Sequence, residues 1–188
     1  MQHLGANAAL VADPDEAGDA AGVVLPGVGN FGRCMEALRG SGLDRVALDA
    51  MASGKPFLGI CVGMQMLYEG SEESPGAPGL GVLPGTVARL PDGVKRPQMQ
   101  WNRLLVDQPD HPLMAGIGPD PWVYFVHSYA PPGDADVIAT CEYGGPVVAA
   151  VARDRVWATQ FHPEKSGGVG LALLGNFVAA VLSRGDGS

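Results

Sequence analysis

The segment Gly59-Ile60-Cys61-Val62-Gly63 stands between an apolar strand-like run, 57–60, and a helical run, 64–68. A Gly-x-nucleophile-x-Gly turn between a strand and a helix strains the backbone of its central residue, and glycines flank it because side chains there would collide with both elements. The central atom is then exposed at a helix N-terminus, where free N–H groups favour negative charge. Cys61 is therefore a candidate nucleophile, with the N–H of Val62 as an oxyanion donor. The alternative is that Cys61 is a small buried hydrophobic residue.

The order of apolar runs and helical patterns predicts an α/β protein. Strand-like and helical runs alternate in the first half of the chain, which favours a largely parallel sheet. The elements expected there are strands at 8–11, 22–25 and 57–60 and helices at 31–38 and 43–51. After a loop at 70–84, a series of apolar runs without helices predicts an antiparallel extension packed on this core. Those runs are 86–90, 104–106, 123–126, 137–140, 147–151 and 156–161, and a helix at 171–182 follows. We expect one domain over residues 1–184 and a tail at 185–188.

Composition excludes several classes of protein. Of the 188 residues, 46% are hydrophobic and 17% are charged, which is typical of a folded domain. A net charge of −8 with scattered basic residues argues against nucleic-acid binding. Apolar runs far shorter than the ~20 residues of a membrane span, and a start unlike a signal peptide, predict a cytoplasmic protein without a membrane contact. Three cysteines without a CxxC pair and four histidines without ligand spacing predict neither a metal site nor another cofactor.

His162 is the best candidate for the base that a catalytic thiol needs. It follows the apolar run 156–161, and Pro163 biases it toward an extended conformation. Residues two apart in an extended chain project to the same side, so Glu164 is placed to orient the imidazole as the third member of a triad. A solvated His-Pro-Glu turn is the alternative. The other histidines are His3, His111 and His127. The first two are expected at the surface, and His127 has no carboxylate near it in sequence.

Several motifs together resemble the triad (class I) glutamine amidotransferases, and specifically the glutaminase subunit of imidazole glycerol phosphate synthase. The Cys61 turn and the His-Pro-Glu turn are shared across the whole superfamily. The motifs that carry the resemblance are Pro26-Gly27-Val28-Gly29-Asn30-Phe31, Gly59-Ile60-Cys61-Val62-Gly63-Met64-Gln65, Gln100-Trp101-Asn102, Tyr124-Phe125-Val126-His127-Ser128-Tyr129 and Gln160-Phe161-His162-Pro163-Glu164-Lys165-Ser166. The resemblance covers most of the chain and implies a three-layer, flavodoxin-like fold of the class I glutamine amidotransferase type.

The resemblance also implies a reaction and a partner. Cys61 would attack the side-chain amide of L-glutamine, and the resulting thioester would be hydrolysed to glutamate. The ammonia would pass to a (β/α)8-barrel cyclase that makes imidazole glycerol phosphate and aminoimidazole carboxamide ribotide. Oxyanion and substrate contacts would come from Gly27, Val28, Gly29, Val62, Gln65, His127, Ser128 and Tyr129. The partner would be met by Trp101, Asn102, Tyr124 and Lys165.

The chain departs from the family pattern in two places. The pattern opens with a strand, a Tyr-Gly-x-Gly-Asn loop and a helix that precede the residues found here, so we expect a misassigned or truncated start and an unpaired sheet edge. Gln100 also stands where the family usually has glycine. Three alternatives remain open: the amidotransferase subunit of anthranilate or aminodeoxychorismate synthase, a degenerate subunit without activity, and a cysteine hydrolase or chaperone with a similar Cys61 turn.

Overall fold

The computed structural model describes residues 1–133 and 136–183, so the tail predicted at 185–188 lies outside the described residues. Its α-helices are α1 (Phe31–Gly40), α2 (Leu43–Ala52), α3 (Val62–Gln65) and α4 (Gly167–Leu182). Short 3-10 turns are η1 (Gln2–Leu4), η2 (Pro14–Glu16), η3 (Pro112–Met114) and η4 (Pro163–Lys165). The strands are β1 (Val23–Gly27), β2 (Phe57–Cys61), β3 (Gly70–Ser71), β4 (Thr86–Arg89), β5 (Gln98–Arg103), β6 (Leu105–Val106), β7 (Trp122–His127), β8 (Tyr129–Ala130), β9 (Val137–Glu142), β10 (Pro146–Arg153) and β11 (Val156–Thr159).

The central sheet confirms the predicted α/β architecture but is mixed rather than mostly parallel. Its strand order is β1-β2-β11-β10-β9-β6. Strands β1, β2 and β11 pair in parallel, whereas β11, β10, β9 and β6 pair antiparallel. The predicted antiparallel extension therefore continues the same sheet instead of packing on it, because strands joined by short hairpins need no crossover helix.

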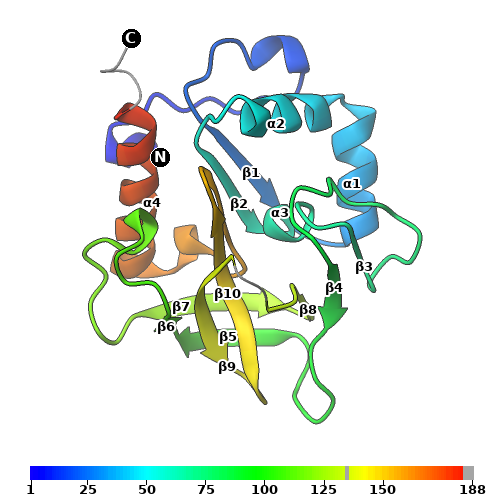
Figure 1. Ribbon diagram of the computed structural model, residues 1–188, viewed down its shortest axis with the longest axis vertical. Helices are drawn as coiled ribbons and strands as arrows, with labels where there is room; N and C mark the ends of the chain where they lie inside the picture. Colours follow the sequence, from blue (N-terminus) through cyan, green and yellow to red (C-terminus); the bar gives the residue numbers. More distant parts are fainter. Residues whose placement is uncertain (134–135, 184–188) are drawn as a thin grey trace.

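Helices cover the sheet on both sides, and the apolar face of α1 explains how that helix packs. In Figure 1, α1 and α2 lie on one side of β1 and β2, and α4 lies on the other. Helix α1 buries Phe31, Met35 and Leu38, whose spacing places them on one helical face. Helix α4 packs on β11 through the rings of Trp157 and Phe177, whose centroids are 6.1 Å apart. Within the described ranges, no helix is both long and apolar enough to cross a membrane.

Two predicted elements differ from the structure. The run 8–11 is not a strand, and Leu10 is 94% exposed. A strand needs a neighbour to satisfy its backbone groups, and within the described part of the chain β1 pairs with β2 alone. Helix α3 ends at Gln65 instead of continuing to Tyr68, because the next bonds are tighter, from Tyr68 N–H to the Gln65 carbonyl and from Leu67 N–H to Met64.

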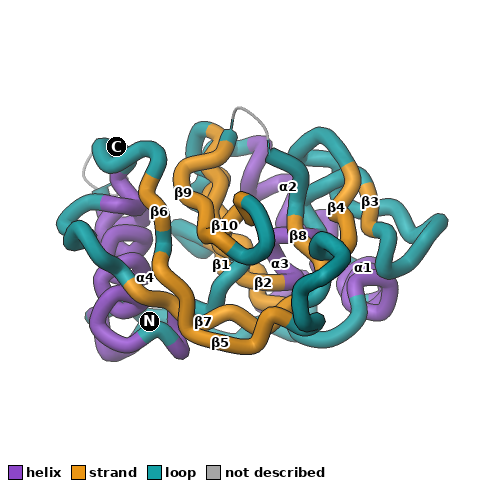
Figure 2. The backbone as a smooth tube through the Cα atoms, turned by 90° about the horizontal axis from the view of Figure 1, so that it is seen from below, coloured by secondary structure: helices purple, strands orange, loops and turns teal. Residues whose placement is uncertain are grey.

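A separate two-stranded sheet, β5 with β7, was not fully expected, because only β7 carries an apolar run. The two strands pair antiparallel from Gln98 opposite His127 to Arg103 opposite Trp122. They run across the molecule below the ends of β1 and β2 that lead into α1 and α3 (Figure 1). The view from below shows β5 and β7 side by side, between α4 and β8 (Figure 2).

Candidate active site

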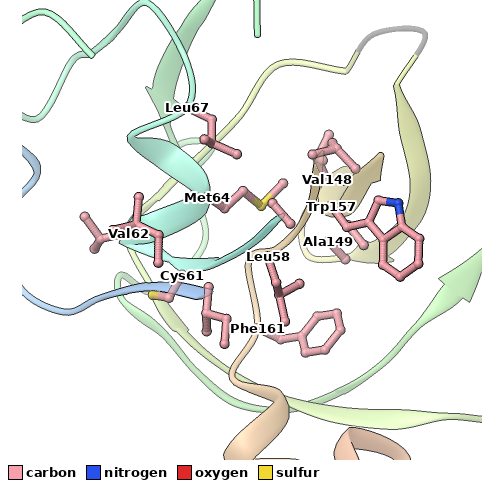
Figure 3. Packing of buried hydrophobic residues seen from close by; sticks show 14 of the residues in the cluster. Leu58, Cys61, Val62, Met64, Leu67, Val148, Ala149, Trp157 and Phe161 are labelled. Atoms are coloured by element: carbon pink, nitrogen blue, oxygen red, sulfur yellow. The ribbon is translucent and has the colours of Figure 1, made fainter. Parts of the chain in front are cut away.

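Cys61 lies at the junction of β2 and α3, in the strained turn that the sequence predicts and that we call the elbow (residues 59–63). Its backbone has φ 56° and ψ −112°, a conformation that side-chain-bearing residues rarely adopt. A Cβ on Gly63 would overlap the carbonyl oxygen of Leu25, and one on Gly59 would lie 3.0 Å from the N of Met64. Figure 3 shows Cys61 where β2 meets α3, with Met64 and Leu67 pointing into the core. The glycines are therefore required by close packing around the thiol.

Parallel pairing of β1 with β2 brings the predicted oxyanion segment beside the thiol. Gly27 is the register partner of Cys61, and a Cβ on Gly27 would lie 2.7 Å from the N of Gly63. Val28 then leaves the sheet and is 75% exposed, and Gly29 follows with φ 95°. The Cys34 thiol of α1 donates to the Val28 carbonyl at 3.3 Å. The predicted donor segment thus borders Cys61 and is tied to α1.

Strand β11 positions the predicted base, His162, beside Cys61. Its Thr159 pairs with Ile60, one residue before the nucleophile, so the chain beyond β11 passes beside Cys61. His162 Nδ1 lies 2.6 Å from Glu164 Oε1, and the two side chains are 4% and 47% exposed. Hydrogen bonds to Cys61 and then to Glu164 raise the pKa of His162 to about 9, against the opposing effect of burial. The pKa of Glu164 is lowered by the His162 bond and charge despite desolvation.

The three predicted triad residues are thus brought together with the chemistry that each role needs. The raised pKa keeps the His162 imidazole charged at neutral pH, which suits a proton donor to a leaving group. Its Nδ1 proton is held by Glu164, which leaves the other ring nitrogen for the thiol. A thiol, an imidazole and a carboxylate in this order form a nucleophile, an acid–base group and an orienting group.

Gln160 is a residue of this site that the sequence predictions missed. Its side chain is fully buried, and its Nε2 donates to Cys61 Sγ at 3.8 Å. Gln65, predicted to hold substrate, donates from Nε2 to Gln160 Oε1 at 3.0 Å and to the Tyr129 carbonyl at 2.9 Å. Both donors of Gln65 are therefore used within the protein, and its oxygen remains for a ligand. No local sequence signal marks Gln160, apart from its place two residues before His162.

His127 is buried and interacts electrostatically with His162. Its Nδ1 is 2.8 Å from the Tyr129 carbonyl, and its Nε2 is 3.0 Å from Gln98 Oε1. Burial lowers its pKa to about 4, so the ring is neutral at pH 7. Ser128 is half-buried, and its carbonyl accepts from Leu90 N–H at 2.9 Å.

Three of the four predicted interface residues lie on the β5–β7 sheet, on its two faces. Trp101 and Tyr124 are register partners on the outer face, with ring centroids 6.2 Å apart. Met99 and Trp122 share that face by alternation and are exposed, although the sequence did not single them out. Asn102 lies on the opposite face and donates from Nδ2 to the Glu142 carbonyl at 2.9 Å. We call Met99, Trp101, Trp122 and Tyr124 the outer aromatic face.

Lys165 is exposed and follows Glu164 in η4, and the turn it belongs to borders the outer aromatic face. A Cβ on Gly167 would lie 3.9 Å from the Trp101 ring. Among the residues that the structure describes, no three His, Cys, Asp or Glu side chains gather as a metal site would require.

Comparison with known proteins extends this picture. The model of the "Glutamine amidotransferase class-I" family matches residues 5–181. Imidazole glycerol phosphate synthase subunit HisH of Synechococcus elongatus is 50% identical over 188 residues, covering 97% of this chain and 86% of that protein. The HisH subunit of Methanothermobacter thermautotrophicus is 47% identical over 184 residues, covering 96% and 90%.

Solved structures share the fold. The crystal structure of a glutamine amidotransferase superposes with a TM-score of 0.73 at 22% identity, covering 96% of this chain and 89% of that one. A glutamine amidotransferase from Thermotoga maritima gives a TM-score of 0.59 at 17% identity, covering 89% and 79%. The chain therefore belongs to the class I glutamine amidotransferase family, as one of its imidazole glycerol phosphate synthase HisH subunits.

Proposed function

We propose that the chain hydrolyses L-glutamine to L-glutamate and ammonia at Cys61 and passes the ammonia to a synthase partner. The observation that carries this proposal is the placement of Cys61 in a strained elbow beside a buried His162 that holds Glu164 at 2.6 Å. Relatives about half identical over nearly the whole chain are HisH subunits, which supports glutamine as the substrate.

The reaction follows from the chemistry of the three groups. The Cys61 thiolate attacks the side-chain carbonyl carbon of glutamine, and the C–N bond breaks as His162 donates its proton to the leaving ammonia. The neutral imidazole then takes a proton from water as the water oxygen attacks the thioester carbon. The C–S bond breaks, which restores the Cys61 thiolate beside the charged imidazole and releases glutamate, whose acid proton passes to solvent. Because Glu164 stabilises the charged imidazole, it assists each time His162 holds the proton.

The developing oxyanion needs N–H donors, and we propose the main-chain N–H groups of Val62 and Val28 for this role. Val62 follows Cys61 at the start of α3, and Val28 stands next to the register partner of Cys61. Preorganised donors of this kind are each worth roughly 3–4 kcal/mol of transition-state stabilisation. Gly27 and Gly29 allow the segment to approach closely, and we propose Gln65, His127, Ser128 and Tyr129 as the surrounding substrate wall.

The partner we propose is a (β/α)8-barrel cyclase bound to the outer aromatic face. The relatives are named as one subunit of a synthase, which implies a second subunit. Exposed aromatic residues on a rigid strand pair are typical anchors of a protein interface. Lys165 lies in the turn beside this face and next to the triad, so it is placed to respond to the partner.

Labelling with a glutamine-like alkylating agent tests this function. A chloroketone analogue of glutamine should modify Cys61 in the presence of the cyclase and should abolish ammonia release, and excess glutamine should protect. Iodoacetamide, which lacks the amino-acid group, is the control for simple thiol reactivity. Labelling that depends on an anthranilate-type synthase partner instead, or failure of the analogue to label Cys61 in the complex, would contradict the proposal.

A further inference from the structure

A chain of buried amides leads from a backbone carbonyl to the proposed nucleophile. The Tyr129 carbonyl accepts from Gln65 Nε2 at 2.9 Å, and the same Nε2 donates to Gln160 Oε1 at 3.0 Å. Gln160 Nε2 then reaches Cys61 Sγ at 3.8 Å. Both glutamine side chains are buried, Gln160 completely.

The carbonyl fixes the direction of this chain. A backbone carbonyl can only accept, so the group of Gln65 that faces Tyr129 must be its NH2. The second hydrogen of that NH2 is donated to Gln160, whose side-chain oxygen must be the acceptor. A half-turn of the Gln160 amide would set two NH2 groups against each other and place its oxygen against the sulfur. Cys61 is therefore presented with an N–H donor.

We propose that Gln160 is a catalytic residue that holds Cys61 as a thiolate through an N–H···S bond, and that Gln65 is the positioning residue that fixes the Gln160 amide. This inference rests on the proposed role of Cys61 as nucleophile. A thiolate accepts hydrogen bonds far better than a thiol or a thioester sulfur, so the bond favours the reactive form. It also assigns Gln65 a role in the free enzyme, separate from any contact with substrate.

The test is the rate of Cys61 alkylation by iodoacetamide as a function of pH, followed by mass spectrometry of the Cys61 peptide in the wild-type complex and in Gln160→Met. Loss of the donor should move the midpoint of this profile up by about one pH unit, the equivalent of about 1.4 kcal/mol. The less stabilised thiolate is also more nucleophilic, so the limiting rate at high pH should rise about threefold. The rate–pH curves of the wild type and Gln160→Met should therefore cross, with the variant slower at low pH and faster at high pH. A variant whose fold was merely loosened would not show this crossing.

Other titratable groups do not change in this comparison. His162 and Cys34 are the described groups that interact electrostatically with Cys61, and both remain in the variant. A matched control is Gln98→Met, because the buried Gln98 amide contacts the sulfur of the core cysteine Cys141 at the same 3.8 Å. It should cost comparable stability and leave the Cys61 midpoint where it is in the wild type.

Gln65→Met separates positioning from substrate binding. If Gln65 only holds glutamine, this variant raises KM and leaves the alkylation profile of the substrate-free protein unchanged. The proposal expects the midpoint to rise without any substrate present. Should Gln160→Met fail to fold, Gln160→Glu keeps the shape, replaces the donor by an acceptor and should raise the midpoint at least as far.

The outcomes distinguish this inference from the proposed function. Unchanged midpoints in Gln160→Met, or an equal shift in Gln98→Met, would overturn the inference while alkylation of Cys61 still abolished glutaminase activity. If alkylated Cys61 left glutaminase activity intact, the proposed function itself would be wrong.

Discussion

The main-chain carbonyl of Tyr124 accepts a hydrogen bond from the main-chain N–H of His162 at 3.0 Å. Ser166 completes the link, because its Oγ accepts from Tyr124 N–H at 3.0 Å and donates to the His162 carbonyl at 2.6 Å. Strand β7 thus holds the proposed base by both of its backbone groups. The side chain of Tyr124, by contrast, lies on the outer aromatic face. A partner bound there would press on the strand that positions His162.

Removing the Ser166 hydroxyl should therefore weaken catalysis as well as stability. Ser166→Ala leaves the Tyr124 N–H without its partner and removes one of the two hydrogen bonds to the His162 carbonyl, which keeps the bond from Lys165 N–H. The unpaired N–H costs about 1–3 kcal/mol in the free energy of unfolding. Because the base is less firmly held, kcat with the partner should fall at least fivefold while KM changes little. Steady-state kinetics and urea unfolding measure both. Ser183→Ala is the control, since within residues 1–133 and 136–183 the Ser183 Oγ bonds to the exposed Ala180 carbonyl alone. An unchanged kcat in Ser166→Ala would contradict this role.

The raised pKa of His162 predicts the alkaline limit of the reaction. Its charged form is needed to protonate ammonia, so kcat/KM should fall as the pH passes about 9. In Glu164→Gln the carboxylate that helps to raise this pKa is lost. The alkaline fall of kcat/KM should therefore move toward the ordinary histidine value near 6.5. Activity at neutral pH should drop less than in His162→Ala. The pH profile of kcat/KM decides, and a limb that stays at its wild-type position would show that Glu164 does not tune the base.

The same shift has a consequence for stability with a defined sign. The folded pKa of His162 lies above the unfolded one, so its charged form stabilises the fold fully below pH 6.5 and this contribution is lost as the pH rises through about 9. The difference in unfolding free energy between wild type and His162→Ala should therefore shrink from pH 6.5 to 9. A difference that grew over this range in urea titrations would contradict the assignment.

The elbow should tolerate no side chain at Gly63. In Gly63→Ala the new methyl group would overlap the Leu25 carbonyl, so β1 or the elbow must move at a cost of about 1–3 kcal/mol, and glutaminase activity should be lost. The matched control is Gly168→Ala in α4, where nothing lies within 4 Å. That variant should gain stability, by up to about 1 kcal/mol. Equal unfolding midpoints for the two variants would show that the elbow is not tightly packed.

Truncation of Trp101 tests the proposed docking surface. Its ring is exposed beside Tyr124, and a central aromatic anchor is worth about 2 kcal/mol or more, so Trp101→Ala should weaken binding of the cyclase roughly 30-fold. Leu48→Ala is the control, because Leu48 is an exposed apolar residue on α2. Calorimetric titration compares the two. Equal affinities would place the partner elsewhere.

Local patterns predicted the parts of the site that depend on neighbours in sequence. The strand, the glycines and the short helix around Cys61 are set by residues 57–65, and the pairing of His162 with Glu164 follows from two-residue spacing. The run 22–25 became β1, and the helical patterns at 31–38 and 43–51 became α1 and α2. These features follow from sterics and periodicity, which a sequence displays directly.

Features that depend on distant neighbours were not predictable. Strand β5 mixes polar and apolar residues, because Gln98 is its only buried residue and most of the others are exposed, so no apolar run marks it. Gln160 became part of the site only because β11 pairs with β2, which brings Gln160 beside Cys61 although 99 residues separate them in sequence. The run 8–11 has strand-like composition, but composition cannot form a strand without an adjacent one.

Release of glutamate from L-glutamine tests the central claim most directly. The wild-type chain mixed with the proposed barrel cyclase and a ligand of that partner's synthase site should form glutamate and ammonia in equal amounts, and the chain alone should be far slower. Cys61→Ser, which keeps the elbow's size and packing, should reduce the rate in the complex to the uncatalysed background. Glutamate release by Cys61→Ser at a rate near that of the wild type would contradict the account.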